Sequence, residues 1–295
     1  VVADVTEEKN RSKGMAFIGM AFGLGFIFGP AIGGLLSLVD LTNLYPLSVE
    51  MGINPFSMPA LGAALLTFLN LFLVLRFFKE TNKEQHQAKI SHPRSINPLV
   101  LFKPLPYANV NLVNFGHFFF LFLFSGMEFT LTFFAAEKLG FNARQNALMF
   151  VFIGLVLAFT QGGYVRRKAA SVGEKKMSLQ GLFLVMIGLF CLSFTTNKML
   201  LYTALFFLAT GGAMVIPCLT ALASLLLPKE VQGRGLGLFR SLGALARVVG
   251  PLLLSVIYWK IGSSSLYLIV AVLFCIPLLF ISKIKQVKKN SDFQK

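Results

Sequence analysis

Long apolar stretches alternate along the chain with short segments that carry most of its charged residues. A stretch of about 20 apolar residues, folded as a helix, crosses the roughly 30 Å hydrocarbon core of a bilayer. The pattern therefore predicts an all-α membrane protein. Eight stretches are expected to form transmembrane helices: residues 14–38, 58–78, 111–134, 147–165, 177–195, 200–227, 235–257 and 264–282.

The connecting segments differ strongly in positive charge. With the first helix starting in the cytosol, 21 Lys and Arg residues fall in cytosolic segments and four in outer segments. Because positive residues accumulate on the cytosolic side of membrane proteins, we expect both ends of the chain in the cytosol. The pattern does not distinguish the plasma membrane from an organelle membrane.

The composition excludes several other classes of protein. The chain is 56% hydrophobic and 13% charged, which leaves too little polar surface to cover a soluble globule. Its net charge of +15 lies in short loops, unlike the single basic face of a nucleic-acid-binding protein. No nucleotide-binding loop, zinc-protease motif or serine-hydrolase motif occurs, so we expect no enzyme, cofactor or metal site. Three cysteines, Cys191, Cys218 and Cys275, fall in apolar stretches, where buried thiols are expected.

The first apolar stretch is rich in glycine. Small residues recur every four positions from Ala21 to Gly33, so on a helix they form a ridge along which another helix can approach closely. Pro30 cannot donate a backbone hydrogen bond to the preceding turn and should bend the helix. An ordinary packing face would explain one pair of glycines, whereas this longer run favours a moving interface. The residues of this conformational motif are Gly25, Gly29, Pro30, Gly33 and Gly34.

The third stretch carries a single polar stripe. At 100° per residue, five polar side chains fall within about 80° of one another, while the phenylalanines point elsewhere. Such a stripe indicates a water-filled cavity or contact with another polar helix. Its members are Asn114, His117, Ser125, Glu128 and Thr132.

Two charged side chains lie deep in the predicted helices. Glu128 is roughly 25 Å along its helix, and Arg247 is roughly 18 Å along its own, near the bilayer midplane. An unpartnered charge at the centre of a span costs roughly 2.5 to 3.5 kcal/mol, so we expect both in a substrate or proton pathway with Gln161 and the polar stripe. Simpler alternatives are a hydrogen-bonded His117 near the cytosolic end, a Glu128 that reaches the outer surface, and interhelical hydrogen bonding of Gln161.

An internal repeat relates two glycine-rich stretches. Lys13-Gly14 precedes Gly29-Pro30 at the spacing at which Arg234-Gly235 precedes Gly250-Pro251, and the two segments are 221 residues apart. Because they belong to the first and seventh predicted helices, the repeat unit is six helices.

One motif resembles a known family. The run from Gly25 to Gly34, GFIFGPAIGG, resembles the antiporter motif on the fifth helix of drug:proton antiporters in the major facilitator superfamily, and Ala3-Asp4-Val5-Thr6 resembles the end of their fourth helix. The whole chain, and especially the segment 119–167, is similar to the eukaryotic tetracycline-transporter-like branch of that superfamily. The loop 162–168 departs from the family's G-x-x-x-D-R pattern, because Arg166 or Arg167 replaces the acid, so its usual cytosolic charge latch is not expected.

The resemblance implies the major facilitator fold of twelve helices in two bundles. Combined with the repeat, it places the predicted helices as numbers five to twelve, with four ahead of residue 1. The expected parts are residues 1–78, the last two helices of the N-terminal bundle; 79–109, a cytosolic linker; 110–284, the C-terminal bundle; and 285–295, a basic cytosolic tail. Cytosolic charge pairs are expected among Asp4, Arg11, Glu230 and Arg234.

The implied function is secondary active transport by alternating access, powered by an ion gradient. The family suggests proton-coupled export of amphiphilic or anionic organic compounds, as in drug efflux. The expected partners are a small organic substrate, protons and the lipid bilayer, with no nucleic acid and a monomeric protein. Two alternatives remain: an uncoupled facilitator, and a transporter-like receptor or scaffold that does not transport.

Overall fold

The computed structural model describes residues 57–78, 101–228 and 231–285, together with separate positions between 25 and 54. Every regular element among these residues is a helix. The chain divides into two compact units. One unit comprises residues 1–94 and 141–155, and the other comprises residues 95–140 and 156–295.

The first unit contains the short helix α3 (Leu41–Leu44) and the long helix α4 (Ser57–Phe77). Asp40 caps α3, because its carboxylate accepts hydrogen bonds from the backbone N–H and the hydroxyl of Thr42, at 2.9 and 2.6 Å. The helix α4 coincides with the predicted stretch 58–78 and is long and apolar enough to cross a membrane.

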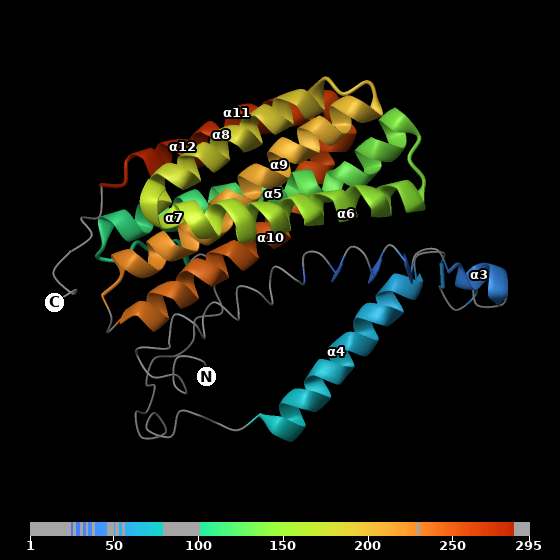
Figure 1. Ribbon diagram of the computed structural model, residues 1–295, viewed down its shortest axis with the longest axis horizontal. Helices are drawn as coiled ribbons and strands as arrows, with labels where there is room; N and C mark the ends of the chain where they lie inside the picture. The colour runs from blue at the N-terminus through green and yellow to red at the C-terminus, as the bar shows by residue number, and fades with distance from the viewer. Residues whose placement is uncertain are drawn as a thin grey trace. The chain divides into compact units, whose positions relative to one another are not determined.

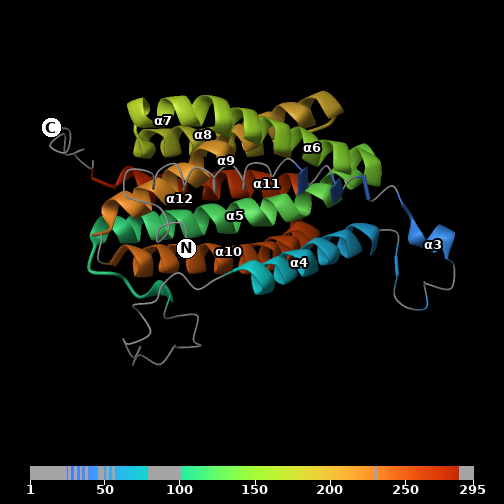
Figure 2. The ribbon, with the colours of Figure 1, turned by 60° about the horizontal axis from the view of Figure 1, so that its bottom comes forward.

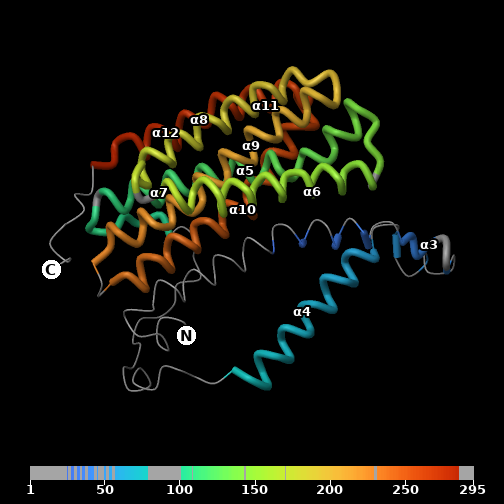
Figure 3. The backbone as a smooth tube through the Cα atoms, in the orientation of Figure 1, coloured from blue at the N-terminus to red at the C-terminus, as the bar shows by residue number. Residues whose placement is uncertain are grey.

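The second unit is a bundle of long helices packed lengthwise against one another (Figures 1 and 3). Its elements are α5 (Ala108–Leu139), the end of α6 (Ala143–Phe159), the π-helix η5 (Thr160–Val165), α7 (Arg166–Val172), α8 (Glu174–Ser193), α9 (Lys198–Leu226), α10 (Gln232–Ile261), α11 (Ser263–Leu273) and α12 (Cys275–Ser282). In all, seven helical segments of the described residues could span a membrane. They confirm seven of the eight predicted stretches; the eighth, 14–38, lies mostly outside the described residues.

The helices differ from the predicted stretches in two places. The sequence predicts one helix over residues 147–165, but the last turn widens to the π-helix η5 and the chain continues helically through α7. The predicted helix 264–282 divides at Phe274 into α11 and α12. Pro277 lacks the N–H that would bond to the carbonyl of Leu273, which accounts for the break.

Glycines set where several helices stop. Gly140, Gly173 and Gly262 follow α5, α7 and α10 with φ angles of 65°, 87° and 83°, in the left-handed region that glycine adopts without strain. At the other end of a helix, the Asn197 side chain accepts a hydrogen bond from the Leu200 N–H at 2.9 Å and starts α9.

Close glycine contacts hold two pairs of helices together. Between α8 and α9, a Cβ on Gly181 would lie 2.7 Å from the Gly211 carbonyl oxygen, so a larger side chain does not fit. The other pair is α5 and α10, which lie side by side in two views (Figures 1 and 2). Small residues let helix backbones approach within a bilayer, where burying apolar surface gives no net drive.

Candidate functional site

The polar stripe of α5 faces α10. The two helices run in the same direction, because His117 meets Gly243 near their starts, Ser125 meets Gly250 in the middle, and Glu137 meets Tyr258 near their ends. Two of the three contacts involve a glycine of α10. The stripe therefore lies along a close helix interface for much of its length.

At the first of these contacts, His117 is tightly enclosed. Its ring stacks on Phe239 of α10 with centroids 3.8 Å apart and planes 15° apart, and its Nε2 lies 2.8 Å from where a Cβ on Gly243 would be. Asn114, one turn earlier, is 3% exposed and His117 is 5% exposed. Asn114 Oδ1 and His117 Nδ1 are both buried without a hydrogen-bond partner among the described residues. Buried polar atoms normally have hydrogen-bond partners. Asn114 and His117 are therefore an unusual polar pair within the apolar packing near the start of α5.

The middle contact combines a close approach with a broken hydrogen-bond ladder. A Cβ on Gly250 would collide with the Phe122 carbonyl oxygen and lie 2.8 Å from Ser125 Oγ, which is itself buried without a partner in the described part of the chain. Pro251 follows inside α10 and has no N–H for the carbonyl of Arg247. The helix α10 therefore lacks one backbone hydrogen bond, the one that the Arg247 carbonyl would accept.

Glu128 and Arg247 are the two charges of this interface. Both side chains are exposed at the surface of the unit, in contrast to the buried Asn114 and His117. Arg247 lies close enough for its charge to act on both Glu128 and His117. With Ser125 opposite Gly250, the two charged residues are offset by about 9 Å along the helix axes, within reach of a long arginine side chain. The fold therefore brings together the acid and the base that the sequence placed on separate helices.

Other predicted residues lie elsewhere. Thr132 is half-buried, and its hydroxyl donates to the Phe129 carbonyl of its own helix at 3.4 Å. Gln161 is half-buried in η5, which packs with α7 and α9. Arg234 is exposed in the first turn of α10.

The glycine motif of the first stretch is only partly described. No described atom lies within 4 Å of where a Cβ would be on Gly25, Gly29 or Gly33, so their close contact stays a prediction. Pro30, Gly34, Asp4, Arg11 and Glu230 lie outside the described residues.

The expectation of three buried thiols is wrong for Cys275, which is exposed on α12. Cys218 is buried, Cys191 is half-buried, and all three are free. An apolar stretch fixes the depth of a residue in the membrane but does not fix which side of its helix packs against a neighbour.

Two hydrogen bonds of the bundle escaped the sequence analysis. The Tyr258 hydroxyl of α10 donates to a Glu137 carboxylate oxygen of α5 at 2.6 Å, and the hydroxyls of Tyr267 and Thr130 join α11 to α5 at 3.2 Å. The partners are 121 and 137 residues apart, and no local pattern relates them. The one available signal was Glu137 itself, an acid at the end of an apolar stretch.

Comparisons with known proteins agree with this architecture. The family model described as Major Facilitator Superfamily matches residues 1–251. The mouse protein named major facilitator superfamily domain-containing protein 10 is 30% identical over 310 residues, which cover 99% of this chain and 64% of the mouse protein. The class C tetracycline resistance protein of Escherichia coli is 25% identical, over 94% of this chain and 67% of that protein.

A solved structure is similar over most of the chain. It is the crystal structure of the human organic anion transporter MFSD10 (TETRAN), with a TM-score of 0.71 and 29% identity, covering 95% of this chain and 66% of the human one. A peptide transporter crystallised with sulfate shares the fold at a TM-score of 0.55 and 18% identity. The chain thus spans a little under two thirds of the mouse relative's length.

Proposed function

Because this chain belongs to the major facilitator superfamily, we propose that it forms part of a secondary transporter that exports amphiphilic, anionic organic compounds in exchange for protons. It is a multi-pass membrane protein, and its relatives are transporters and not enzymes. The anionic substrate class is supported by the human relative, which is described as an organic anion transporter, and export of amphiphilic compounds by the tetracycline resistance relatives.

The observation that carries the proposal is the exposed pair of charges on α5 and α10. Glu128 and Arg247 lie in spanning helices, where a charge facing lipid is costly, so their face of the bundle requires a polar cavity. In the proposed cycle, the anionic group of the substrate binds the Arg247 guanidinium, and a donor group of the substrate bonds to the ionised Glu128 carboxylate. On the outer side Glu128 takes up a proton, its carboxylate no longer accepts that bond, and the substrate leaves. When the empty site faces the cytosol again, Glu128 releases the proton and the next substrate binds, so that substrate and proton occupy the site in alternation.

The α5–α10 interface supplies the movement in this scheme. His117, Asn114 and Ser125 have buried polar atoms without partners in the described part of the chain, and Gly243 and Gly250 bring α10 against them. Sliding or tilting of α10 at Pro251 would expose these atoms to water and supply the partners that they lack. The closed interface is one state of the alternating-access cycle in this proposal.

We also propose a position for the chain in a twelve-helix protein. The predicted stretches are taken as helices five to twelve, with both ends in the cytosol, a monomeric protein, and cytosolic pairs among Asp4, Arg11, Glu230 and Arg234. The 64% share of the mouse relative's length supports this, since eight of twelve helices would be about the same fraction. The parts remain 1–78, 79–109, 110–284 and 285–295.

Cysteine labelling separates a transporter from a receptor or scaffold. In a variant of the full-length protein without Cys191, Cys218 and Cys275, single cysteines replace Ser125, Thr132 or Asn114, and a water-soluble thiol reagent is added. We expect rapid labelling at 132, and labelling at 114 and 125 only when substrate is cycling. The control cysteine replaces Leu268, which is 41% exposed on α11. Labelling no faster than at this control would reject the water-filled pathway.

A flux assay separates proton coupling from an uncoupled facilitator. Full-length protein in liposomes receives radiolabelled p-aminohippurate, an aromatic carboxylate, with and without an imposed pH gradient. We expect the gradient to drive accumulation above equilibrium. Equilibration at the same final level with and without the gradient would favour the facilitator.

A further inference from the structure

A second cavity lies away from the Glu128–Arg247 interface, between η5, α8 and α9. It has a volume of about 440 Å³ and is open on one side. Its walls are mostly apolar: Phe183 and Phe206 are 59% and 49% exposed, and Leu184 and Met214 lie beside them. We name this cavity the lateral groove, and its other lining residues are Thr160, Tyr164, Gln180 and Thr210.

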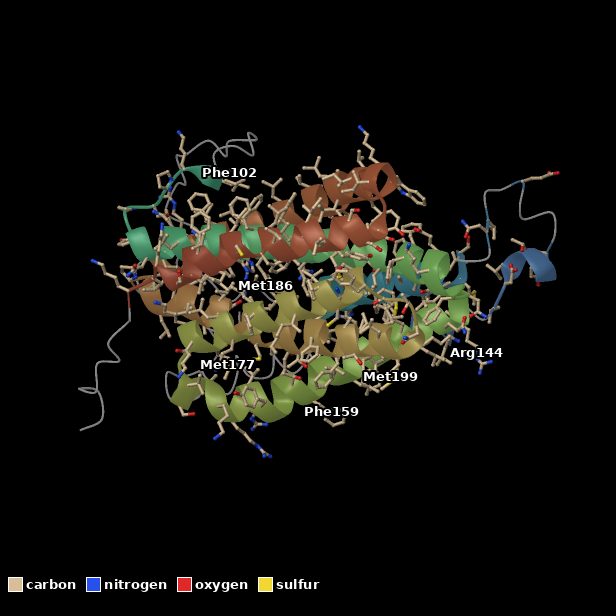
Figure 4. The ribbon with its side chains drawn as sticks, turned by 90° about the horizontal axis from the view of Figure 1, so that it is seen from above. Phe102, Arg144, Phe159, Met177, Met186 and Met199 are labelled. Carbon is tan, nitrogen blue, oxygen red and sulfur yellow. The ribbon has the colours of Figure 1, made fainter. Side chains whose placement is uncertain are left out.

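A buried cluster adjoins the groove through Met214, which belongs to both. Val165 of η5, Met177 of α8, and Met214 and Cys218 of α9 form this cluster. Met177, at the start of α8, and Phe159, just before η5, are labelled in Figure 4, where Phe159, 77% exposed, lies on the outer side of α6. The wide turn of η5 displaces one side of the helix from its neighbours, and such π-turns recur at functional sites.

The groove is lined by neutral polar groups and by no charged side chain among the described residues. Thr160, Gln180 and Thr210 offer hydroxyl and amide groups within the apolar walls. Thr210 Oγ1 is buried and has no hydrogen-bond partner in the described part of the chain. The groove therefore suits a mainly apolar ligand segment that carries one or two hydrogen-bond acceptors.

Positive charges lie close along the chain to two lining residues of the groove, Tyr164 and Gln180. Arg166, Arg167 and Lys168 follow directly after η5 and are exposed. Lys176 is also exposed and lies one turn before Gln180 on the same face of α8. The adjacent Lys175 is not counted with these cations, because its ammonium donates hydrogen bonds to the carbonyls of Ser282 and Ile284 at 2.7 and 2.6 Å.

The only acid between residues 160 and 183 points to another side of its helix. Glu174 lies two residues before Lys176, about 200° around α8, and its charge acts on Cys218 of the buried cluster. The described walls of the groove present no acidic residue.

Arg167 and Lys168 follow the lining residue Tyr164 by three and four residues. Lys176 precedes the lining residue Gln180 by four, so these three cations share helix faces with the groove.

We propose that the lateral groove binds an anionic glycerophospholipid, with its phosphate on Arg167, Lys168 and Lys176 and one acyl chain along Phe183 and Phe206. The ester oxygens would reach the Gln180 amide and the Thr210 hydroxyl. The groove extends along α9 from Phe206 to Met214, about 12 Å of helix, so an acyl chain follows it from the headgroup level toward the middle of the bilayer. Basic clusters at the ends of spanning helices attract acidic headgroups, whereas a zwitterionic lipid gains little from them. This site does not depend on the proposed transport function.

The single tryptophan of this chain makes a direct test possible in the full-length protein, once any tryptophan outside the chain has been replaced by Phe. Trp259 lies on α10 and is 70% exposed, and it does not line the groove. In a second protein, the groove reporter, Trp259→Phe is combined with Phe183→Trp, which moves the only tryptophan into the groove wall. Both proteins are placed in phosphatidylcholine vesicles that contain a minor fraction of lipid with brominated acyl chains, which quench tryptophan fluorescence on contact. The brominated lipid is either phosphatidylglycerol or phosphatidylcholine.

From the quenching of the groove reporter, we expect an affinity for brominated phosphatidylglycerol at least about fivefold above that for brominated phosphatidylcholine. This is the gain in affinity that roughly one basic residue provides. Trp259 of the wild-type protein should show no such preference. Replacing Arg167 and Lys168 by Gln should remove the preference of the groove reporter. The matched variant, Lys283→Gln with Lys285→Gln, removes cations at the end of α12 and should leave it intact.

Several outcomes would overturn the proposed lipid site. Equal quenching of the groove reporter by the two lipids overturns it, and so does a preference that Trp259 shares, because that would be a general attraction to the basic protein. A preference that survives loss of Arg167 and Lys168, or that falls equally in the α12 variant, also overturns the assigned phosphate site. The Thr210→Val variant serves as a second measure: because both lipids carry the ester oxygens, we expect weaker quenching of the groove reporter by both lipids, with the preference and the thermal unfolding unchanged.

Discussion

The Tyr258 hydroxyl of α10 donates a hydrogen bond of 2.6 Å to the Glu137 carboxylate of α5. It joins the far end of an interface whose near end is fixed by the stacking of His117 on Phe239. Between these two attachments lie Gly250, Pro251 and the two charges. The interface is therefore anchored at both ends, and between the anchors Pro251 interrupts the backbone hydrogen bonds of α10 where we place the chemistry.

Removing the anchoring hydroxyl should weaken the bundle. Tyr258→Phe leaves the buried ring in place but deprives Glu137 of its donor, so we expect a loss of about 1 to 2 kcal/mol in the free energy of unfolding, as for a hydrogen bond to a charged group. Unfolding in mixed detergent micelles measures it. Tyr267→Phe, which loses a longer neutral contact to Thr130, should cost less. An unfolding curve of Tyr258→Phe that overlays the wild-type curve would contradict the anchor.

The two helices should tolerate no side chain at Gly250. Its Cβ would collide with the Phe122 carbonyl, which is backbone and cannot turn aside, so Gly250→Ala should destabilise the protein by about 1 to 3 kcal/mol. Gly237 lies on the same helix, and a Cβ added there would meet no atom within 4 Å. Because alanine favours the helix over glycine, Gly237→Ala should be neutral or stabilise the protein by up to about 1 kcal/mol. The same unfolding assay applies to both. Equal stability of the two variants would show that the helices do not pack this closely.

The sequence predicted the helices well and the contacts between them only in part. Apolar length places a helix in the membrane, so α4 and α8 to α10 lie within a few residues of the predicted stretches. Spacing on a single helix predicted the stripe from Asn114 to Glu128 as one face; in the structure Asn114 and His117 are buried and Glu128 is exposed. Which helix would cover that face could not be predicted, because lipid and apolar helices present the same surface to it.

The other differences between the predicted and the observed structure have causes that the spacing of apolar residues does not reveal. The π-turn of η5 changes the number of residues per turn without changing composition, and the pairing of Glu137 with Tyr258 depends on tertiary distance alone. The sequence did assign Gly250 a special position, through its repeat with Gly29. In the structure Gly250 is a point of very close approach to α5, for the steric reason that the pattern implied.

The repeat makes a prediction for the first stretch. If Gly29 packs against another helix as Gly250 does, Gly29→Leu should abolish transport by the full-length protein while leaving membrane insertion intact, because a branched side chain separates closely packed helices. Surface labelling measures insertion and substrate flux measures transport. Gly23→Leu, off the ridge, is the control. Wild-type flux in the Gly29 variant would reject the contact.

Arg247 should determine the affinity for anions. Arg247→Ala removes the guanidinium beside Glu128, and we expect binding of p-aminohippurate to weaken by about tenfold or more, as for loss of one charge-assisted hydrogen bond. Binding of its uncharged glycinamide analogue should change little. Arg240, exposed on the same helix and near its start, provides the matched variant Arg240→Ala. If both arginine variants weaken anion binding equally, the effect is one of general charge and Arg247 has no special role.

Glu128 carries the central claim, that one acid on α5 moves the proton. Glu128→Gln keeps the size and hydrogen-bonding shape of the side chain but cannot exchange a proton at any working pH. The full-length variant should therefore still exchange p-aminohippurate across liposomes at equal pH on both sides. Glu174→Gln, at the start of α8, is the matched control and should behave as wild type.

The decisive measurement is accumulation of p-aminohippurate driven by an imposed pH gradient in liposomes that contain the Glu128→Gln protein. We expect exchange to continue while gradient-driven accumulation disappears. Accumulation at the wild-type level would contradict the central claim, and Glu128 would then be an acid at the surface of the bundle with no part in proton coupling.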